Sequence, residues 1–214
     1  MTALEAIAAA FGVLCVVLTI RQNIWCWPTG LVMVVLYIYI FADAKLYADA
    51  GLQVIYIVLS IYGWVHWARG GDRDNPLPVT TLSGRARAAW ILAALLGTAS
   101  LGFGLSRLTD AALPYPDAFI ASLSLVAQWL MARKKLESWL AWITVDAVAI
   151  AVFAAKELYI TSGLYALFLG LAIAGYLGWK KSRDAATGSS SASSSRPTAA
   201  ISSSSNSPAP SAPN

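Results

Sequence analysis

The sequence predicts an all-α polytopic membrane protein with seven transmembrane helices, and three observations lead to this prediction. The 214 residues are 58% hydrophobic and only 12% charged, whereas soluble domains carry about 25% charged residues. Seven apolar runs approach the length of about 20 residues that a helix needs to cross a bilayer. Nine Trp and nine Tyr suit the aromatic belts that membrane proteins place at the two lipid–water interfaces.

The apolar runs divide the chain into two three-helix bundles with one helix between them. They cover residues 4–20, 27–42, 52–67, 88–105, 118–132, 139–155 and 158–179. We expect the first bundle within 1–67, a cytoplasmic loop at 68–87, a linker transmembrane helix at 88–105 and the second bundle within 106–181. From 182 to 214 the composition changes to Ser, Ala and Pro, which predicts a disordered cytoplasmic tail because such a segment cannot bury enough apolar surface to fold.

The basic residues predict the orientation of the chain. With seven spans, twelve Lys and Arg fall on the side of the C-terminus, and three (Lys45, Arg107 and Lys156) fall on the other side. Because cytoplasmic loops carry the excess of Lys and Arg, we expect the C-terminus in the cytoplasm and the N-terminus outside. The same bias explains the formal net charge of +4, so the charge is no reason to expect nucleic acid as a partner.

The two predicted bundles resemble each other when the chain is shifted against itself by 112 residues. The matched pairs include Arg21/Arg133, Trp27/Trp139, Gly63/Gly175 and Trp67/Trp179. Because one extra helix separates the copies, both triplets enter the membrane in the same direction, which predicts a 3+1+3 parallel internal repeat of the SWEET-like type. In that architecture a substrate path runs between the halves near the midplane; the alternative is that the duplicated helices only build a stable bundle.

Polar and aromatic residues that share helix faces are candidates to line such a path. The candidate substrate-binding residues are Gln53, Tyr56, Ser124, Gln128, Trp139, Trp142 and Asp146. Asp146 is the acid nearest the middle of a span, where a charge costs several kcal/mol unless it faces a polar cavity or a partner. Trp139 and Trp142 fit two roles equally, an interfacial belt or a surface that stacks on a flat or cationic ligand.

The sequence offers no motif for enzyme chemistry. One His and two Cys are too few for a metal cluster or a disulfide framework. No Gly-rich loop suits a phosphate, and no Ser/His or metal-ligand spacing suits hydrolysis. We therefore expect no catalytic residues, no metal and no cofactor.

Several motifs in order along the chain resemble those of the PnuC family of bacterial nicotinamide riboside transporters. They are Arg21-Gln22-Asn23-x-Trp25-x-Trp27-Pro28-x-Gly30, Leu46-Tyr47-Ala48-Asp49, Tyr62-Gly63-Trp64-x2-Trp67, Asp117-Ala118-Phe119, Glu137-Ser138-Trp139-x2-Trp142-Ile143-x-Val145-Asp146 and Lys156-x-Leu158-Tyr159. The resemblance covers roughly residues 4–181. It implies a multi-pass protein of the bacterial inner membrane that passes nicotinamide riboside, an NAD precursor, by facilitated diffusion with alternating access between the two bundles.

The resemblance also suggests roles for the candidate residues. The flat cationic pyridinium suits Trp139 and Trp142, the ribose hydroxyls suit Gln53 and Gln128, and Asp146 offsets the positive charge. The alternatives are a related vitamin such as thiamine, coupling to protons or sodium, and a membrane component that binds ligand without transporting it. We expect a small-molecule substrate and the lipid bilayer as partners, and the sequence leaves open whether the chain forms a homo-oligomer.

Overall fold

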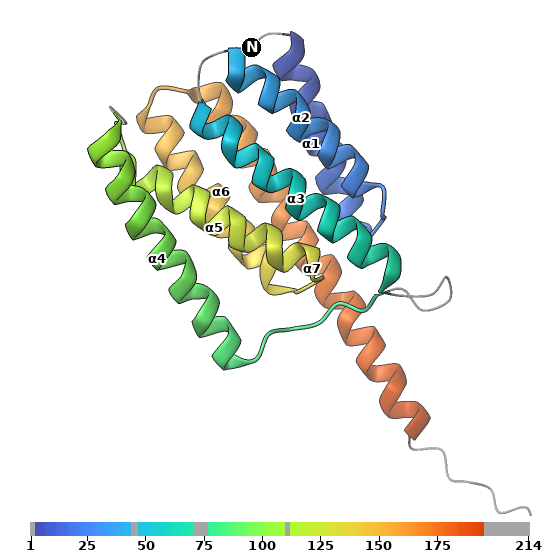
Figure 1. Cartoon of the computed structure of the whole chain (residues 1–214). Helices are drawn as coiled ribbons and strands as arrows, with labels where there is room; N and C mark the ends of the chain where they lie inside the picture. Colours follow the sequence, from blue (N-terminus) through green and yellow to red (C-terminus); the bar gives the residue numbers. More distant parts are fainter. Residues whose placement is uncertain (1–2, 44–46, 71–76, 110–111, 195–214) are drawn as a thin grey trace, which may run out of the picture.

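The computed structural model describes residues 3–43, 47–70, 77–109 and 112–194, and these residues form seven helices (Figure 1). The helices are α1 (Ala3–Ile20), α2 (Cys26–Asp43), α3 (Tyr47–Arg69), α4 (Gly84–Leu108), α5 (Pro114–Ala132), α6 (Glu137–Ala155) and α7 (Tyr159–Ser194). Within the described ranges the extended pairing is a single parallel bridge between Thr80 and Lys135. The all-α prediction is confirmed.

Six of the seven described helices are long and apolar enough to cross a membrane, and α5 is the exception. With 19 residues α5 matches the others in length, but it carries Asp117, Ser122, Ser124 and Gln128. It packs against α3, α4 and α6, which shields its polar face from lipid. The prediction of seven spans is therefore confirmed for six by composition, and α5 differs because its polar groups face protein.

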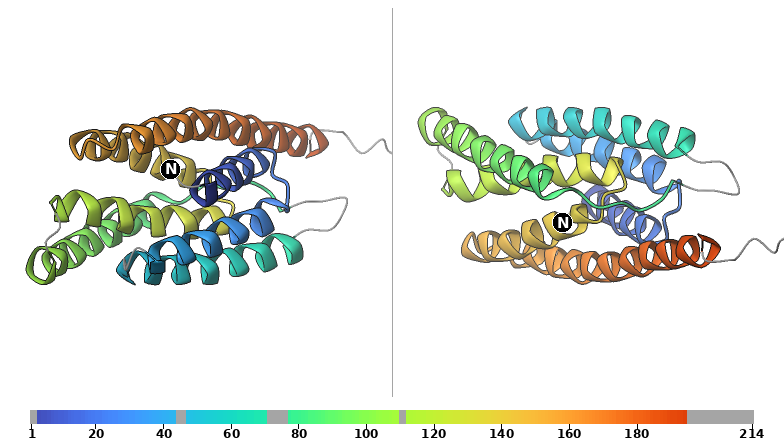
Figure 2. Two further views of the ribbon diagram at one scale, coloured as in Figure 1. Left: turned by 90° about the horizontal axis from the view of Figure 1, so that it is seen from above. Right: turned by 90° about the horizontal axis from the view of Figure 1, so that it is seen from below.

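The helices form two triplets, α1–α2–α3 and α5–α6–α7, in which consecutive helices pack together. The triplets meet along two lines of contact, which we call the α3/α5 seam and the α1/α7 seam. Within the described part of the chain α4 contacts no helix other than α5, and it lies at the periphery in the views from above and from below (Figure 2). We call the end of the bundle where α7 projects the lower end, as Figure 1 is drawn.

The turns after α1 and α5 have the same backbone conformation at positions 112 residues apart. Gln22 and Lys134 both adopt left-handed φ values, 55° and 53°, which are uncommon for residues other than Gly. The N–H of Gln22 donates to the carbonyl of Thr19 at 2.9 Å, and the N–H of Lys134 donates to that of Met131 at 2.9 Å. The first helix of each triplet therefore ends in the same way.

Two boundaries differ from the sequence prediction. Helix α4 begins at Gly84, four residues inside the expected loop, because the Ser83 side chain caps it by accepting from the N–H of Ala86. Helix α7 continues to Ser194, so the chain from 182 to 194 is helical where we expected disorder. This stretch contains three Ala, the strongest helix former, and no Pro interrupts the chain between 182 and 196. The rest of the predicted tail (195–214) and Lys45 lie outside the described residues.

Candidate functional site

Polar side chains from four helices meet near the middle of the bundle. The side chains of Tyr56 on α3 and Ser124 on α5 lie next to each other, and Ser124 Oγ donates to the carbonyl of Ile120 at 2.6 Å. Tyr165 on α7 lies within electrostatic range of both Tyr56 and Asp146 of α6. We call Tyr56, Ser124, Asp146 and Tyr165 the central cluster.

Asp146 is the charged member of the central cluster, and it is buried, with 4% of its surface exposed. Within the described part of the chain, it accepts no hydrogen bond and forms no ion pair that would offset its burial. A buried carboxylate with no partner is costly. The central cluster is therefore suited to a ligand that brings a positive charge or hydrogen-bond donors.

The α3/α5 seam continues below the central cluster. Gln128 Nε2 donates to Ser60 Oγ at 3.4 Å, and the ring of Tyr62 stacks on Trp129 with 5.0 Å between centroids. Gln53 is half-buried on α3, three residues before Tyr56 and hence on the same face. The predicted polar residues of α3 and α5 therefore lie along one contact between the triplets.

Trp139 packs in the interior at the lower end, two turns of α6 below Asp146. Its ring is T-shaped against Trp179, with 5.5 Å between centroids, and a Cβ on Gly175 would lie 2.5 Å from its ring carbons. Trp142 is half-buried and packs against the buried hydrophobic side chains that include Trp139 and Trp179. The belt alternative is wrong for Trp139, which is 2% exposed, and its ring is held by α7 and not by the central cluster.

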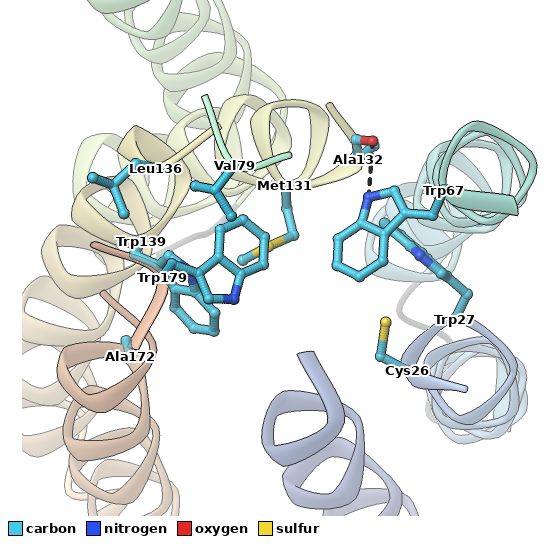
Figure 3. Close-up of a cluster of buried hydrophobic side chains, with 10 residues drawn as sticks. All are labelled: Cys26, Trp27, Trp67, Val79, Met131, Ala132, Leu136, Trp139, Ala172 and Trp179. Carbon is cyan, nitrogen blue, oxygen red and sulfur yellow. Dashed lines mark hydrogen bonds between the residues drawn. The ribbon is translucent and has the colours of Figure 1, made fainter. Parts of the chain in front are cut away.

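The first triplet repeats this arrangement with Trp27 and Trp67. Their rings are T-shaped at 5.4 Å, and the ring of Trp27 occupies the space that a Cβ on Gly63 would take. The rings of Trp67 and Trp179 lie 5.9 Å apart across the middle. We call the four indoles, Trp27, Trp67, Trp139 and Trp179, the tryptophan cluster (Figure 3). Trp27, Trp67 and Trp179 lie at the end of the spans, where a lipid-facing belt is usual, but the structure buries them.

Two indole hydrogen bonds join the triplets at the lower end. Trp67 Nε1 donates to the carbonyl of Ala132 at 3.1 Å, the bond drawn in Figure 3. Trp179 Nε1 donates to the carbonyl of Thr19 at 3.0 Å. Each third helix therefore binds the last turn of the first helix of the other triplet.

Residues 77–83 cross the lower end of the bundle on the way from α3 to α4 (Figure 2, right). The N–H of Thr80 donates to the carbonyl of Lys134 at 3.2 Å, and the N–H of Leu136 donates to that of Thr80 at 2.9 Å. Val79 is buried and packs against the cluster. The bundle is therefore closed at its lower end by aromatic rings and a bound loop.

The upper end carries an ion pair. Lys156 Nζ lies 2.7 Å from Asp117 Oδ1 and 2.8 Å from Oδ2. Asp49, at the start of α3, is within electrostatic range of both groups. Both ends of the bundle thus hold polar contacts, and the unpaired carboxyl lies between them.

Comparison with known proteins identifies this arrangement. Residues 2–181 match the family model described as nicotinamide mononucleotide transporter. The chain belongs to this family, the PnuC family. The nicotinamide riboside transporter PnuC of Escherichia coli is 28% identical in an alignment of 201 positions that covers 82% of this chain and 84% of that protein. The riboflavin/roseoflavin transporter RibM of Streptomyces davaonensis is 28% identical over 182 residues, covering 82% of this chain and 83% of RibM.

A solved structure agrees with the family assignment. The crystal structure of the vitamin B3 transporter PnuC superimposes with a TM-score of 0.70 and 27% identity, covering 85% of this chain and 82% of that one. The protein is therefore a membrane transporter of the PnuC type and not an enzyme. Because the relatives include carriers of two different vitamins, the family by itself does not fix the substrate.

The structure brings together only part of the predicted PnuC site. Tyr56, Ser124 and Asp146 share the central cluster, and Gln128 binds Ser60 just below it. Sequence reasoning missed Tyr165, although the 112-residue shift aligns it with Gln53, a predicted site residue. The polar Gln53 at the equivalent position of the first triplet was the signal that could have pointed to Tyr165.

Proposed function

We propose that the protein carries nicotinamide riboside across the bacterial inner membrane by facilitated diffusion, and that the central cluster is its binding site. The observation that carries the proposal is Asp146, a buried carboxyl in a PnuC-type transporter that pairs with none of the residues the structure describes. The pyridinium ring of nicotinamide riboside bears a positive charge, which a buried carboxylate stabilises. The isoalloxazine ring of riboflavin is neutral, so Asp146 favours the riboside over the flavin.

The remaining candidate residues suit the rest of that substrate. Gln53, Tyr56, Ser124 and Gln128 offer hydrogen bonds for the ribose hydroxyls, and Trp142 offers a ring beside the pyridinium. Trp139, two turns of α6 below Asp146, then bounds the site on the side of the lower end. No Lys or Arg belongs to the central cluster within the described residues, so a phosphorylated substrate such as the mononucleotide would bring a dianion toward Asp146 without a compensating cation.

The two triplets act in this proposal as copies of one unit, related by an axis along the membrane normal, as in SWEET-like carriers. The matching turns at Gln22 and Lys134 and the matching indole pairs support this relationship. Alternating access follows from rocking of the triplets about the central cluster. The lower end, with the excess of Lys and Arg, is the cytoplasmic end.

A binding panel tests the substrate. The purified protein in detergent would be titrated with labelled nicotinamide riboside, and unlabelled riboside, thiamine, riboflavin and nicotinamide mononucleotide would compete. We expect the riboside to displace the label and riboflavin and the mononucleotide to compete poorly. Stronger competition by riboflavin would assign the protein to RibM-like carriers, and stronger competition by thiamine would assign it to a different cationic vitamin.

A further inference from the structure

The two seams between the triplets are equivalent in the repeat but differ in their contacts. The α3/α5 seam contains a side-chain hydrogen bond, a contact between two polar side chains, a ring stack and an indole hydrogen bond. These are Gln128–Ser60, Tyr56–Ser124, Tyr62–Trp129 and Trp67–Ala132. These contacts run from the central cluster to the lower end. The α3/α5 seam is therefore held by polar groups along most of its length.

The α1/α7 seam is held mainly by apolar surface. Between residues 12–20 and 168–179, one hydrogen bond crosses it, from Trp179 Nε1 to the carbonyl of Thr19. A Cβ on Gly178 would lie 3.9 Å from Ile20, and one on Gly12 would lie 3.4 Å from the ring of Phe168. Apolar contacts between helices are readily exchanged for lipid chains, so this seam separates at lower cost.

A second feature reinforces only the α3/α5 seam. Lys134, with 3% of its surface exposed, donates from Nζ to the carbonyl of Leu77 at 2.7 Å. Its ammonium lies 4.7 Å from the centroid of the Trp67 ring on α3. The residue at the equivalent position of the first triplet is Gln22, a half-buried neutral side chain. Lys134 and residues 77–83 thus tie the α5–α6 turn to α3.

We propose that the α3/α5 seam is the hinge of the transport cycle and the α1/α7 seam is the gate through which substrate leaves the central cluster toward the lower end. Lys134 is a positioning residue in this mechanism, because it holds α3 and α5 together while α1 and α7 part. Separating α3 from α5 would withdraw the Lys134 ammonium from the Trp67 ring of α3. The inference rests on the proposed transport function.

Cross-linking each seam tests the proposal in the full-length protein. In a cysteine-free parent (C15A and C26A), one variant would carry I20C and G178C across the gate, and the matched control would carry Y62C and W129C across the hinge. Uptake of labelled nicotinamide riboside into liposomes would be measured before cross-linking with a short bis-methanethiosulfonate reagent, after cross-linking, and after reduction of the disulfides that the reagent forms. Each variant thus serves as its own folding control.

We expect cross-linking of the gate to abolish uptake and reduction to restore it, whereas cross-linking of the hinge leaves most of the uptake. Loss of uptake on cross-linking the hinge, or retention on cross-linking the gate, would overturn the proposal while leaving the transport function intact. A parent that takes up none of nicotinamide riboside, thiamine and riboflavin would refute the proposed function itself.

Lys134 has its own test. K134M should lower uptake several-fold, because α3 and α5 are then no longer held in a fixed relative position. Cross-linking Y62C to W129C in the same chain should restore uptake. The exposed Lys180 supplies the matched control, K180M, which removes an equal charge one residue after Trp179. A K134M defect that the cross-link fails to rescue would contradict a positioning role.

Discussion

At the scale of single residues, Asp146 carries the substrate assignment. D146N keeps the shape of the side chain and removes its charge, so we expect the affinity for nicotinamide riboside to fall about tenfold, which corresponds to about 1.4 kcal/mol. The affinity for a neutral competitor should fall less in D146N, because such a ligand brings no positive charge to the site. Equilibrium binding to the purified variants measures both, and D184N, at an exposed position on α7, is the matched control. Unchanged riboside affinity in D146N would remove Asp146 from the site.

Lys134 predicts an unusual dependence of stability on pH. Burial lowers the pKa of the Lys134 ammonium from 10.5 to about 8, so the folded protein releases this proton at lower pH than the unfolded chain. Between about pH 8 and 10.5 the unfolded state therefore binds more protons, and the contribution of Lys134 to stability rises with pH. The difference in Tm between wild type and K134M should shift in favour of the wild type from pH 7 to pH 9.5. A pH-independent difference would mean that Lys134 is not buried as an ammonium.

The sequence allowed some of these residues to be predicted and concealed others for physical reasons. Asp146 is conspicuous because an acid in an apolar run demands a partner. Tyr165 is not, because Tyr is common in membrane spans as a packing residue. Lys134 lies in a run of basic residues that the positive-inside rule fully explains, and nothing local distinguishes the buried lysine from its exposed neighbours.

At the scale of helices, close packing of Gly against Trp supports both triplets. A Cβ on Gly175 would lie 2.5 Å from the Trp139 ring, so we expect G175A to destabilise the protein by about 1–3 kcal/mol. Gly170, on the same helix, has no atom within 4 Å of such a Cβ, and G170A should be neutral or stabilising because Ala favours helix. Thermal unfolding in detergent compares the two. Equal effects would show that the indole contact is not tight.

Helix positions were predictable from the sequence, but two features of the helices were not. The apolar runs located all seven described helices because a span needs a continuous apolar stretch. They did not show that α5 turns its polar face toward α3, since this depends on contact between distant segments. The predicted end of α7 was too early, because a fall in hydrophobicity marks where a helix leaves the membrane, whereas the helix itself continues to Ser194.

At the scale of the whole molecule, the 112-residue repeat explains why the Trp residues are buried. Four indoles at two pairs of matched positions meet at the lower end only if the triplets face each other. The sequence showed the matched positions, but it placed Trp27, Trp67 and Trp179 at the lipid interface, where Trp is most often found, and it left Trp139 with two equal alternatives, the interface or a ligand. The excess of Lys and Arg at the lower end predicts the orientation of the whole molecule: a single cysteine placed at the exposed Ser182 should react with a membrane-impermeant reagent in inverted vesicles and not in intact cells.

The most direct test of the transport proposal is uptake of labelled nicotinamide riboside into liposomes that contain the purified protein and no ion gradient. A facilitated-diffusion carrier with Asp146 in its site predicts saturable uptake that stops at equal internal and external concentrations and is strongly reduced in D146N. Uptake that requires an imposed proton or sodium gradient, or that is the same in wild type and D146N, would contradict it.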